Sequence, residues 1–170
     1  MSDLKRIKNE FEWVPLHEKV GRFGFPLSNK PDYRKPLLRI ERTGSDKDNY
    51  TDDLFFVNTS GADIELVISG HTGFYTVDDD EQVNLIDKCN YKYENVEDDE
   101  AVKIEEYHDI YDSDFMLGIV LYIKSKKLGN LEIQSRWKKG GIGSTVLLWD
   151  NGEAGKEVGI SEWDIDEQNL

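Results

Sequence analysis

The sequence predicts an all-β fold, an antiparallel two-sheet β-sandwich of about nine strands in an immunoglobulin-like or jelly-roll-like arrangement. Apolar residues recur at every second position in several segments, and turn residues separate these segments at intervals of roughly 8 to 12 residues. No amphipathic helix longer than about three turns is visible after residue 20. A closed β-barrel is the alternative that fits the same pattern.

Residues 1–35 predict an N-terminal arm that packs on the core. Residues 3–13 have the composition of a helical turn or two, whereas prolines and glycines exclude a long helix between residues 14 and 35. In this extended part Phe23, Phe25 and Leu27 occupy alternate positions. We expect these three side chains to anchor the arm on the core, because alternate residues of an extended chain share one face.

Residues 36–160 predict the sandwich domain. Alternation of apolar and polar residues indicates half-buried strands near residues 38–41, 63–68 and 102–105. Residues 115–123 are apolar on both faces, which is typical of a central strand covered on both sides.

Turn residues connect these strands. The segments 58–61, 129–130 and 150–152 contain Asn, Asp, Ser or Gly, which favour tight turns. They predict hairpins, so that neighbouring strands are expected to be antiparallel. Residues 161–170 follow the last strand as an acidic C-terminal tail.

The charge of the chain is unevenly distributed. Its 35 acidic and 21 basic residues give a net charge of −14. Residues 78–114 contain fifteen acidic and three basic residues, whereas residues 1–43 contain ten basic and six acidic ones. Such a field repels nucleic-acid phosphates and anionic lipid, and it speeds encounter with cationic partners. We therefore expect a basic protein partner, with no nucleic acid and no membrane.

Three features indicate a cytoplasmic protein. The segment after Met1–Arg6 lacks the run of roughly 7 to 15 apolar residues that a signal peptide requires. The longest apolar stretch, residues 115–123, is far shorter than the roughly 20 residues of a spanning helix. Cys89 is the single cysteine, so it has no internal disulfide partner and suits a reducing compartment.

One segment combines a histidine with carboxylates. Glu106, His108, Asp112 and Asp114 are the candidate metal ligands, since imidazole and carboxylate both bind divalent ions. The ligand order of a calcium loop or a zinc helix is missing, however, and a strand places only Glu106 and His108 on one face. We expect a solvated strand end, and the alternative is a hydrolase that uses His108 with Glu106 or Asp112.

Two acidic runs lie beside predicted strands. The first contains Asp78, Asp79 and Asp80, and the second contains Glu97, Asp98, Asp99 and Glu100. If the two loops meet at one end of the sandwich, they form a single anionic patch for a basic protein. Three further residues complete the predicted partner-binding set: Tyr107, Tyr111 and Asp112.

The sequence therefore favours a non-enzymatic protein-binding module. A cytoplasmic immunity or inhibitor protein that docks an acidic surface on a basic partner is a concrete example, because it depends on charge complementarity and fast association. No catalytic motif is found, and residues 138–144 lack the order of a phosphate-binding loop. The alternative is a calcium- or carbohydrate-binding module that uses the acidic loops or a strip containing Tyr91 and Tyr93. Calcium aside, no cofactor is expected, and the oligomeric state stays open.

Overall fold

The computed structural model describes residues 4–78 and 81–164 of the chain. These residues form eleven β-strands and no helix, so none of them belongs to a membrane-spanning helix. The strands are β1 (Arg6–Lys8), β2 (Pro36–Gly44), β3 (Thr51–Asn58), β4 (Ile64–Asp78), β5 (Glu81–Val96), β6 (Glu100–His108), β7 (Met116–Ser125), β8 (Gly129–Ser135), β9 (Lys138–Lys139), β10 (Thr145–Trp149) and β11 (Val158–Glu162).

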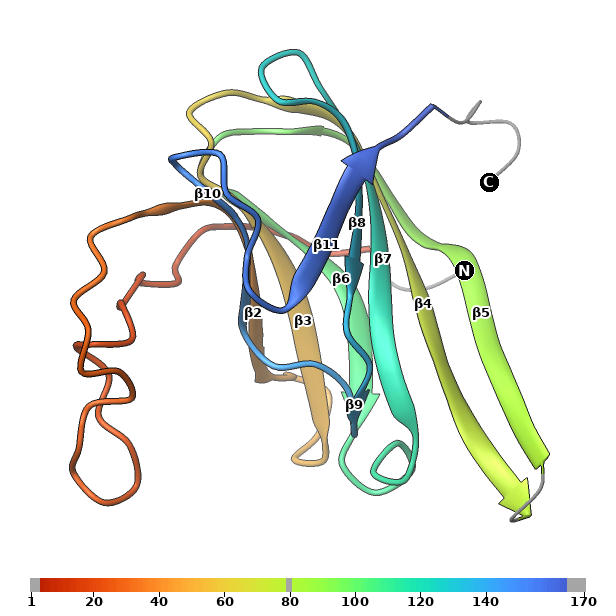
Figure 1. Ribbon diagram of the computed structural model, residues 1–170. Helices are drawn as coiled ribbons and strands as arrows, with labels where there is room; N and C mark the ends of the chain where they lie inside the picture. The colour runs from red at the N-terminus through yellow and green to blue at the C-terminus, as the bar shows by residue number, and fades with distance from the viewer. Residues whose placement is uncertain (1–3, 79–80, 165–170) are drawn as a thin grey trace.

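The strands form two antiparallel sheets (Figure 1). The first sheet has the order β1-β6-β3-β2-β10, and the second has the order β11-β8-β7-β4-β5, with the short β9 paired to β7. Neither sheet closes on itself, so the predicted two-sheet sandwich is confirmed and the closed barrel is wrong. Nine of these strands have at least five residues, which matches the predicted number.

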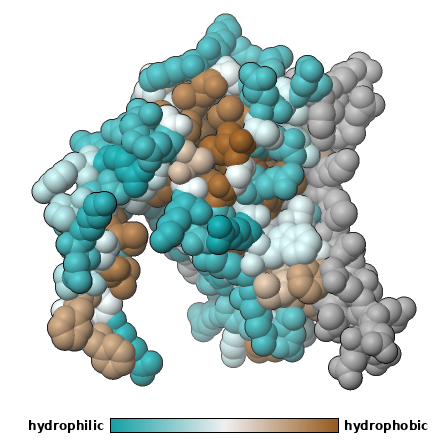
Figure 2. All heavy atoms as spheres, viewed as in Figure 1, coloured by the Kyte–Doolittle hydropathy of each residue, from teal (hydrophilic) through white to brown (hydrophobic). Residues whose placement is uncertain are grey.

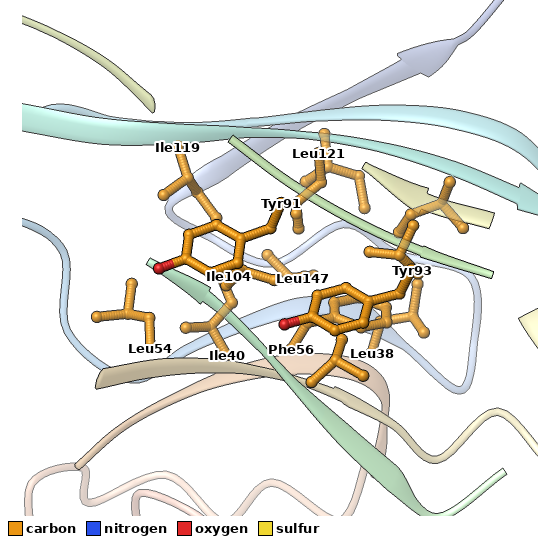
Figure 3. Close-up of a cluster of buried hydrophobic side chains, with 14 of the residues drawn as sticks. Leu38, Ile40, Leu54, Phe56, Tyr91, Tyr93, Ile104, Ile119, Leu121 and Leu147 are labelled. Carbon is orange, nitrogen blue, oxygen red and sulfur yellow. The ribbon is translucent and has the colours of Figure 1, made fainter. Parts of the chain in front are cut away.

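Apolar side chains of both sheets meet in one core (Figure 3). Alternate residues of β2 and β3 point inward because successive side chains of a strand face opposite sides. Strands β5 and β7 supply facing residues, including Tyr91, Tyr93, Ile119 and Leu121. The predicted carbohydrate strip is therefore wrong, because Tyr91 and Tyr93 are 3% and 2% exposed. The hydroxyl of Tyr93 donates a hydrogen bond to the carbonyl of Lys103 at 2.5 Å.

Strand β7 is buried on both faces, as predicted for residues 115–123. Its inward residues join the core, whereas Val120 and Tyr122 belong to a second apolar cluster with residues of β4. Trp163 belongs to this cluster, with its ring centre 5.4 Å from that of Tyr122. The first residues of the predicted acidic tail thus belong to the folded body, since β11 extends to Glu162 and Trp163 is buried.

The N-terminal segment starts with a strand and not with a helix. Residues of β1 pair with β6, and Ile7 and Phe11 pack against Phe55 and its buried neighbours. The helical turn predicted for residues 3–13 is therefore wrong in the described part, residues 4–13. Pairing with a sheet edge and burial of two apolar side chains outweigh a weak local preference for helix.

The next segment projects from the sandwich as a loop (Figure 1). Phe23, Phe25 and Leu27 are 82%, 74% and 58% exposed, so the prediction that they anchor an arm on the core is wrong. The loop instead folds back on itself: the amide of Gly21 donates to the carbonyl of Phe25 at 2.8 Å, and the amide of Leu27 donates to Lys19 at 2.9 Å. These local bonds satisfy the backbone without bringing the aromatic rings to the core.

The turn at residues 58–61 does not close a hairpin. Strand β3 lies in the first sheet and β4 in the second, so the chain crosses between the sheets here. The prediction is wrong because turn residues specify a change of direction but not which sheet the next strand joins. The β7–β8 hairpin forms as predicted. The turn after β10 reverses the chain locally, with the Trp149 amide donating to Glu153 at 2.9 Å, but β11 joins the second sheet, so the hairpin predicted there is wrong.

We expect replacement of Gly141 by alanine to destabilise the fold. Gly141 has a φ of 94°, and a Cβ there would lie 2.4 Å from the buried ring of Tyr107. Strained backbone and overpacking together predict a loss of at least about 2 kcal/mol in the free energy of unfolding, measured by urea denaturation. Gly143→Ala is the matched control, since a Cβ at Gly143 meets nothing within 4 Å. Equal stability of the two variants would contradict the packing described here.

Candidate functional site

The two acidic runs lie at opposite ends of one long strand. The first begins at Asp78, the end of β4, and continues to Glu81, the start of β5. The second, residues 97–100, follows the other end of β5. Because β5 has 16 residues, it separates the runs by roughly 50 Å at about 3.3 Å per residue, and they do not form the single patch considered above. Asp79 and Asp80 lie outside the described residues.

The second acidic run holds neighbouring segments in place. Its carboxylates accept four hydrogen bonds. Asp98 accepts one from the Gly61 amide at 2.9 Å, and Asp99 accepts one from the Asn9 side chain at 2.9 Å. Glu100 accepts one from Arg6 at 3.2 Å and one from the Glu97 amide at 2.7 Å. Glu97, Asp98 and Asp99 are exposed, whereas Glu100 is half-buried. These contacts give the run a structural role at the β5–β6 turn.

The predicted metal ligands do not converge. Among residues 4–78 and 81–164, no group of three His, Cys, Asp or Glu side chains is placed to hold an ion. Instead, each candidate has another partner. Glu106 pairs with Lys103, and Asp114 lies 3.7 Å from Lys139. His108 Nδ1 accepts hydrogen bonds from the amides of Ile110 and Tyr111 at 3.2 Å each, and the Asp112 carboxylate accepts one from the His108 amide at 2.7 Å.

Tyr107 is not available to a partner. It is 2% exposed and lies under the backbone of Gly141, with the Arg42 guanidinium 5.1 Å from its ring centre. Burial, together with the nearby charge of Glu105, raises the pKa of Tyr107 well above its ordinary value. Its inclusion among the partner-binding residues is therefore wrong, because its position on β6 points into the core.

Tyr111 and Asp112 belong to an acidic corner formed by residues 45–50 and 108–114. These are the β2–β3 and β6–β7 connections, which lie at the same end of the sandwich (Figure 1). The corner carries five carboxylates and one lysine: Asp46, Asp48, Asp109, Asp112, Asp114 and Lys47. Between them, three large side chains are exposed: Tyr50 at 55%, Ile110 at 61% and Tyr111 at 76%.

A backbone hydrogen bond joins the two loops of the acidic corner, and a second hydrogen bond orders the first loop. The amide of Asp109 donates to the carbonyl of Tyr50 at 2.7 Å, and the amide of Tyr50 donates to the Asp48 carboxylate at 2.8 Å. That backbone hydrogen bond from Tyr50 is the main reason why the pKa of Asp48 is lowered. The His108 ring lies 4.4 Å from Tyr111 and 6.3 Å from Tyr50. The corner is thus a preformed surface, which sequence patterns did not reveal because its loops are distant in the chain.

A second exposed apolar feature points toward the same end of the molecule (Figure 1). We call residues 19–30 the aromatic loop; its end carries the hydrophobic side chains seen at the lower left of Figure 2. The aromatic loop contains three basic residues, Lys19, Arg22 and Lys30, and no acidic one. It therefore combines exposed aromatic rings with positive charge in a chain that is acidic as a whole.

A groove of about 820 Å³ separates the base of this loop from strands β2 and β10. Trp13 and Trp149 lie within it, in edge contact with ring centres 5.6 Å apart. The charged residues that line it are six bases and four acids: Lys19, Lys30, Arg34, Arg39, Lys138, Lys156, Asp32, Glu41, Glu153 and Glu157. No pattern in the sequence indicated this groove, since its walls come from distant segments.

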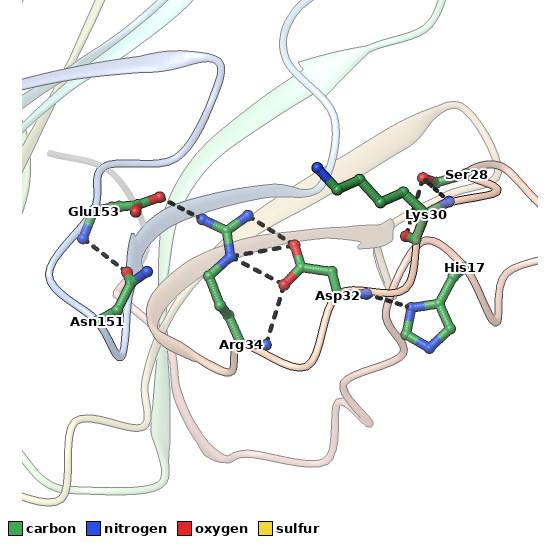
Figure 4. A network of polar contacts seen from close by, with 7 residues as sticks. All are labelled: His17, Ser28, Lys30, Asp32, Arg34, Asn151 and Glu153. Carbon is green, nitrogen blue, oxygen red and sulfur yellow. Dashed lines mark hydrogen bonds and ion pairs between the residues drawn. The ribbon is translucent and has the colours of Figure 1, made fainter.

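An arginine clamp holds the loop to the sandwich at one side of the groove (Figure 4). Arg34 donates to Asp32 at 2.7 Å and to Glu153 at 2.8 Å, and its guanidinium lies 4.2 Å from the ring centre of Trp149. The amide of Asp32 in turn donates to His17 Nδ1 at 3.0 Å. The hydrogen bond from Arg34 lowers the pKa of Asp32 to about 2. The clamp thus links the loop to the turn after β10.

We expect the contribution of the clamp to stability to disappear in strong acid. Folding lowers the pKa of Asp32 from 3.8 to about 2. The ionised Asp32 therefore contributes its full stabilisation at pH values above the unfolded-state pKa, and this contribution is lost as the pH falls through the folded-state pKa. The difference in unfolding free energy between the wild type and Asp32→Asn, measured by denaturant titration, should be constant from pH 7 to about pH 5 and shrink toward pH 2. A difference that stays constant down to pH 2 would show that Asp32 does not stabilise the fold through its charge.

Comparisons with protein-family models, with curated proteins and with solved structures find no match to this chain.

Proposed function

We propose that this chain is a non-enzymatic protein-binding module that docks the acidic corner on a basic protein. The observation that carries the proposal is the exposure of Tyr50, Ile110 and Tyr111 within a rim of carboxylates. Aromatic side chains are the commonest anchors of protein interfaces, and they bind best when a polar rim surrounds them.

The charge and the rigidity of the corner both favour association. Negative charge concentrated at one end of a molecule steers a basic partner toward that end and raises the rate of encounter. The hydrogen bonds of Asp109 and Tyr50 hold the two loops in place before binding. A preformed surface loses less conformational entropy on association than a mobile one.

The aromatic loop adds a second contact at the same end. Phe23 and Phe25 are 82% and 74% exposed, and they project on a loop closed by its own hydrogen bonds. A partner that covers both features would bury large apolar side chains at two separate points. Such spaced anchors favour a protein surface over a small molecule.

An immunity or inhibitor protein of the cytoplasm is the concrete role that we propose. Such a protein blocks a basic effector by covering it, so it requires complementary charge and fast binding and no reactive group. The contacts of His108, whose ring nitrogen accepts two backbone amides, agree with a structural role for this histidine.

We expect reversal of charge at the acidic corner to abolish partner binding. In Asp109→Lys/Asp114→Lys both changed side chains are exposed, so the fold should be retained. Capture of basic proteins from a lysate of the source cells, quantified by mass spectrometry at low and high salt, should fall at least tenfold.

The matched control changes the charge equally at the other end of the molecule. Asp98→Lys/Asp99→Lys alters the β5–β6 turn, and we expect it to leave the captured partner and its salt dependence unchanged. The reverse outcome, loss of the partner only in this second variant, would place the docking surface at residues 97–100 and sink the proposal.

A further inference from the structure

We propose that the groove between the loop and strands β2 and β10 binds a small organic anion that carries phosphate or carboxylate groups on an apolar body. This inference does not rest on docking by the acidic corner, because the groove and the acidic corner share no residue, although the groove includes Lys19 and Lys30 of the aromatic loop.

The charges of the groove are not balanced. Arg34 is neutralised by Asp32 and Glu153, and Arg39 pairs with Glu41 at 2.8 Å. The remaining bases are four lysines, and in the part of the chain that the structure describes none of them has a carboxylate at ion-pairing distance: Lys19, Lys30, Lys138 and Lys156. Glu157 is the one lining carboxylate that remains to oppose them. The groove is thus locally cationic in a protein of net charge −14.

The four lysines approach the groove from different segments. Lys19 and Lys30 belong to the aromatic loop, Lys138 to β9, and Lys156 to the connection between β10 and β11. In Figure 4 the side chain of Lys30 extends beside the arginine clamp without joining it. Each lysine acts as a separate point charge. Lysines from several segments around the groove therefore suit a ligand that carries more than one negative group.

The uncharged lining is mostly apolar, with three hydroxyl side chains, those of Ser28, Ser144 and Thr145. Arg34 lies over the ring of Trp149 and Lys19 lies 5.9 Å from the ring centre of Trp13, so cations already occupy faces of both rings. The ring edges and aliphatic side chains such as Leu16 and Val146 are left to contact the body of a ligand. A ligand with an apolar portion next to its anionic groups therefore complements the groove better than an inorganic ion does.

The size of the groove and the surrounding charge favour a small molecule. About 820 Å³ is within the roughly 300 to 1,000 Å³ of small-molecule sites. A long polyanion that entered the groove would also extend over the acidic surface beyond it, whereas a small anion stays within about 8 Å of the lysines, where screening is weak.

Calorimetric titration of the full chain tests this proposal. The two probes are phenyl phosphate and phthalate, an aromatic dicarboxylate, so that the titrations separate phosphate from carboxylate recognition. We expect saturable binding of at least one probe, and at least tenfold weaker binding to Lys30→Gln/Lys156→Gln. Both side chains are exposed, so the variant should fold, and its unliganded melting temperature verifies this.

The control variant removes the same charge elsewhere. Lys8→Gln/Lys126→Gln changes two exposed lysines that do not line the groove, and it should bind the probe as the wild type does. Equal weakening in both variants would show a general charge effect and overturn the proposal. Failure of both probes to bind would also overturn the proposal. Binding of a hexaglutamate peptide alone would overturn it too, because the groove would then be a site for an acidic polypeptide.

Discussion

The buried amide of Asn58 joins the two sheets at the point where the chain passes from one to the other. Its side-chain nitrogen donates to the carbonyls of Ala62, Val96 and Glu97, and its side-chain oxygen accepts the amide and hydroxyl of Ser60. Asn58 is fully buried, so these polar groups have no access to water there. The hydrogen bonds from Asn58 satisfy them instead. The β3–β4 and β5–β6 connections are fixed together, and the loops of the opposite end are built on the strands that leave this junction.

The strands and the core were predictable because they depend on local pattern. Alternation placed Leu38 and Ile40 inward, and continuous apolarity marked β7 as central. The crossing at Asn58 was not predictable, since the same turn residues also close hairpins. The position of Phe23 was also missed: a hydrophobic residue is buried only when a complementary surface is within reach, and sequence does not show that surface.

The candidate surfaces were predictable in composition but not in arrangement. The excess of acid in residues 78–114 is evident from the sequence, yet the length of β5 divides it between two ends. Tyr111 and Asp112 belong to the acidic corner, and Tyr50 joins them from a loop about sixty residues away. The groove and its clamp escaped prediction for the same reason, because Arg34 meets Glu153 only through the fold.

The pairing of the first sheet has a consequence for the order of events during synthesis. Strand β1 pairs with β6, with Arg6 opposite Val102, and β2 pairs with β10, with Ile40 opposite Thr145. Each partner of these early strands is therefore translated about a hundred residues later, which at roughly 5 to 20 residues per second is a delay of several seconds. Contacts so distant in sequence form slowly, because a large loop must close before any of them is made. The first sheet is thus completed only after β10 has been synthesised, and until then the growing chain exposes the edges of its earlier strands.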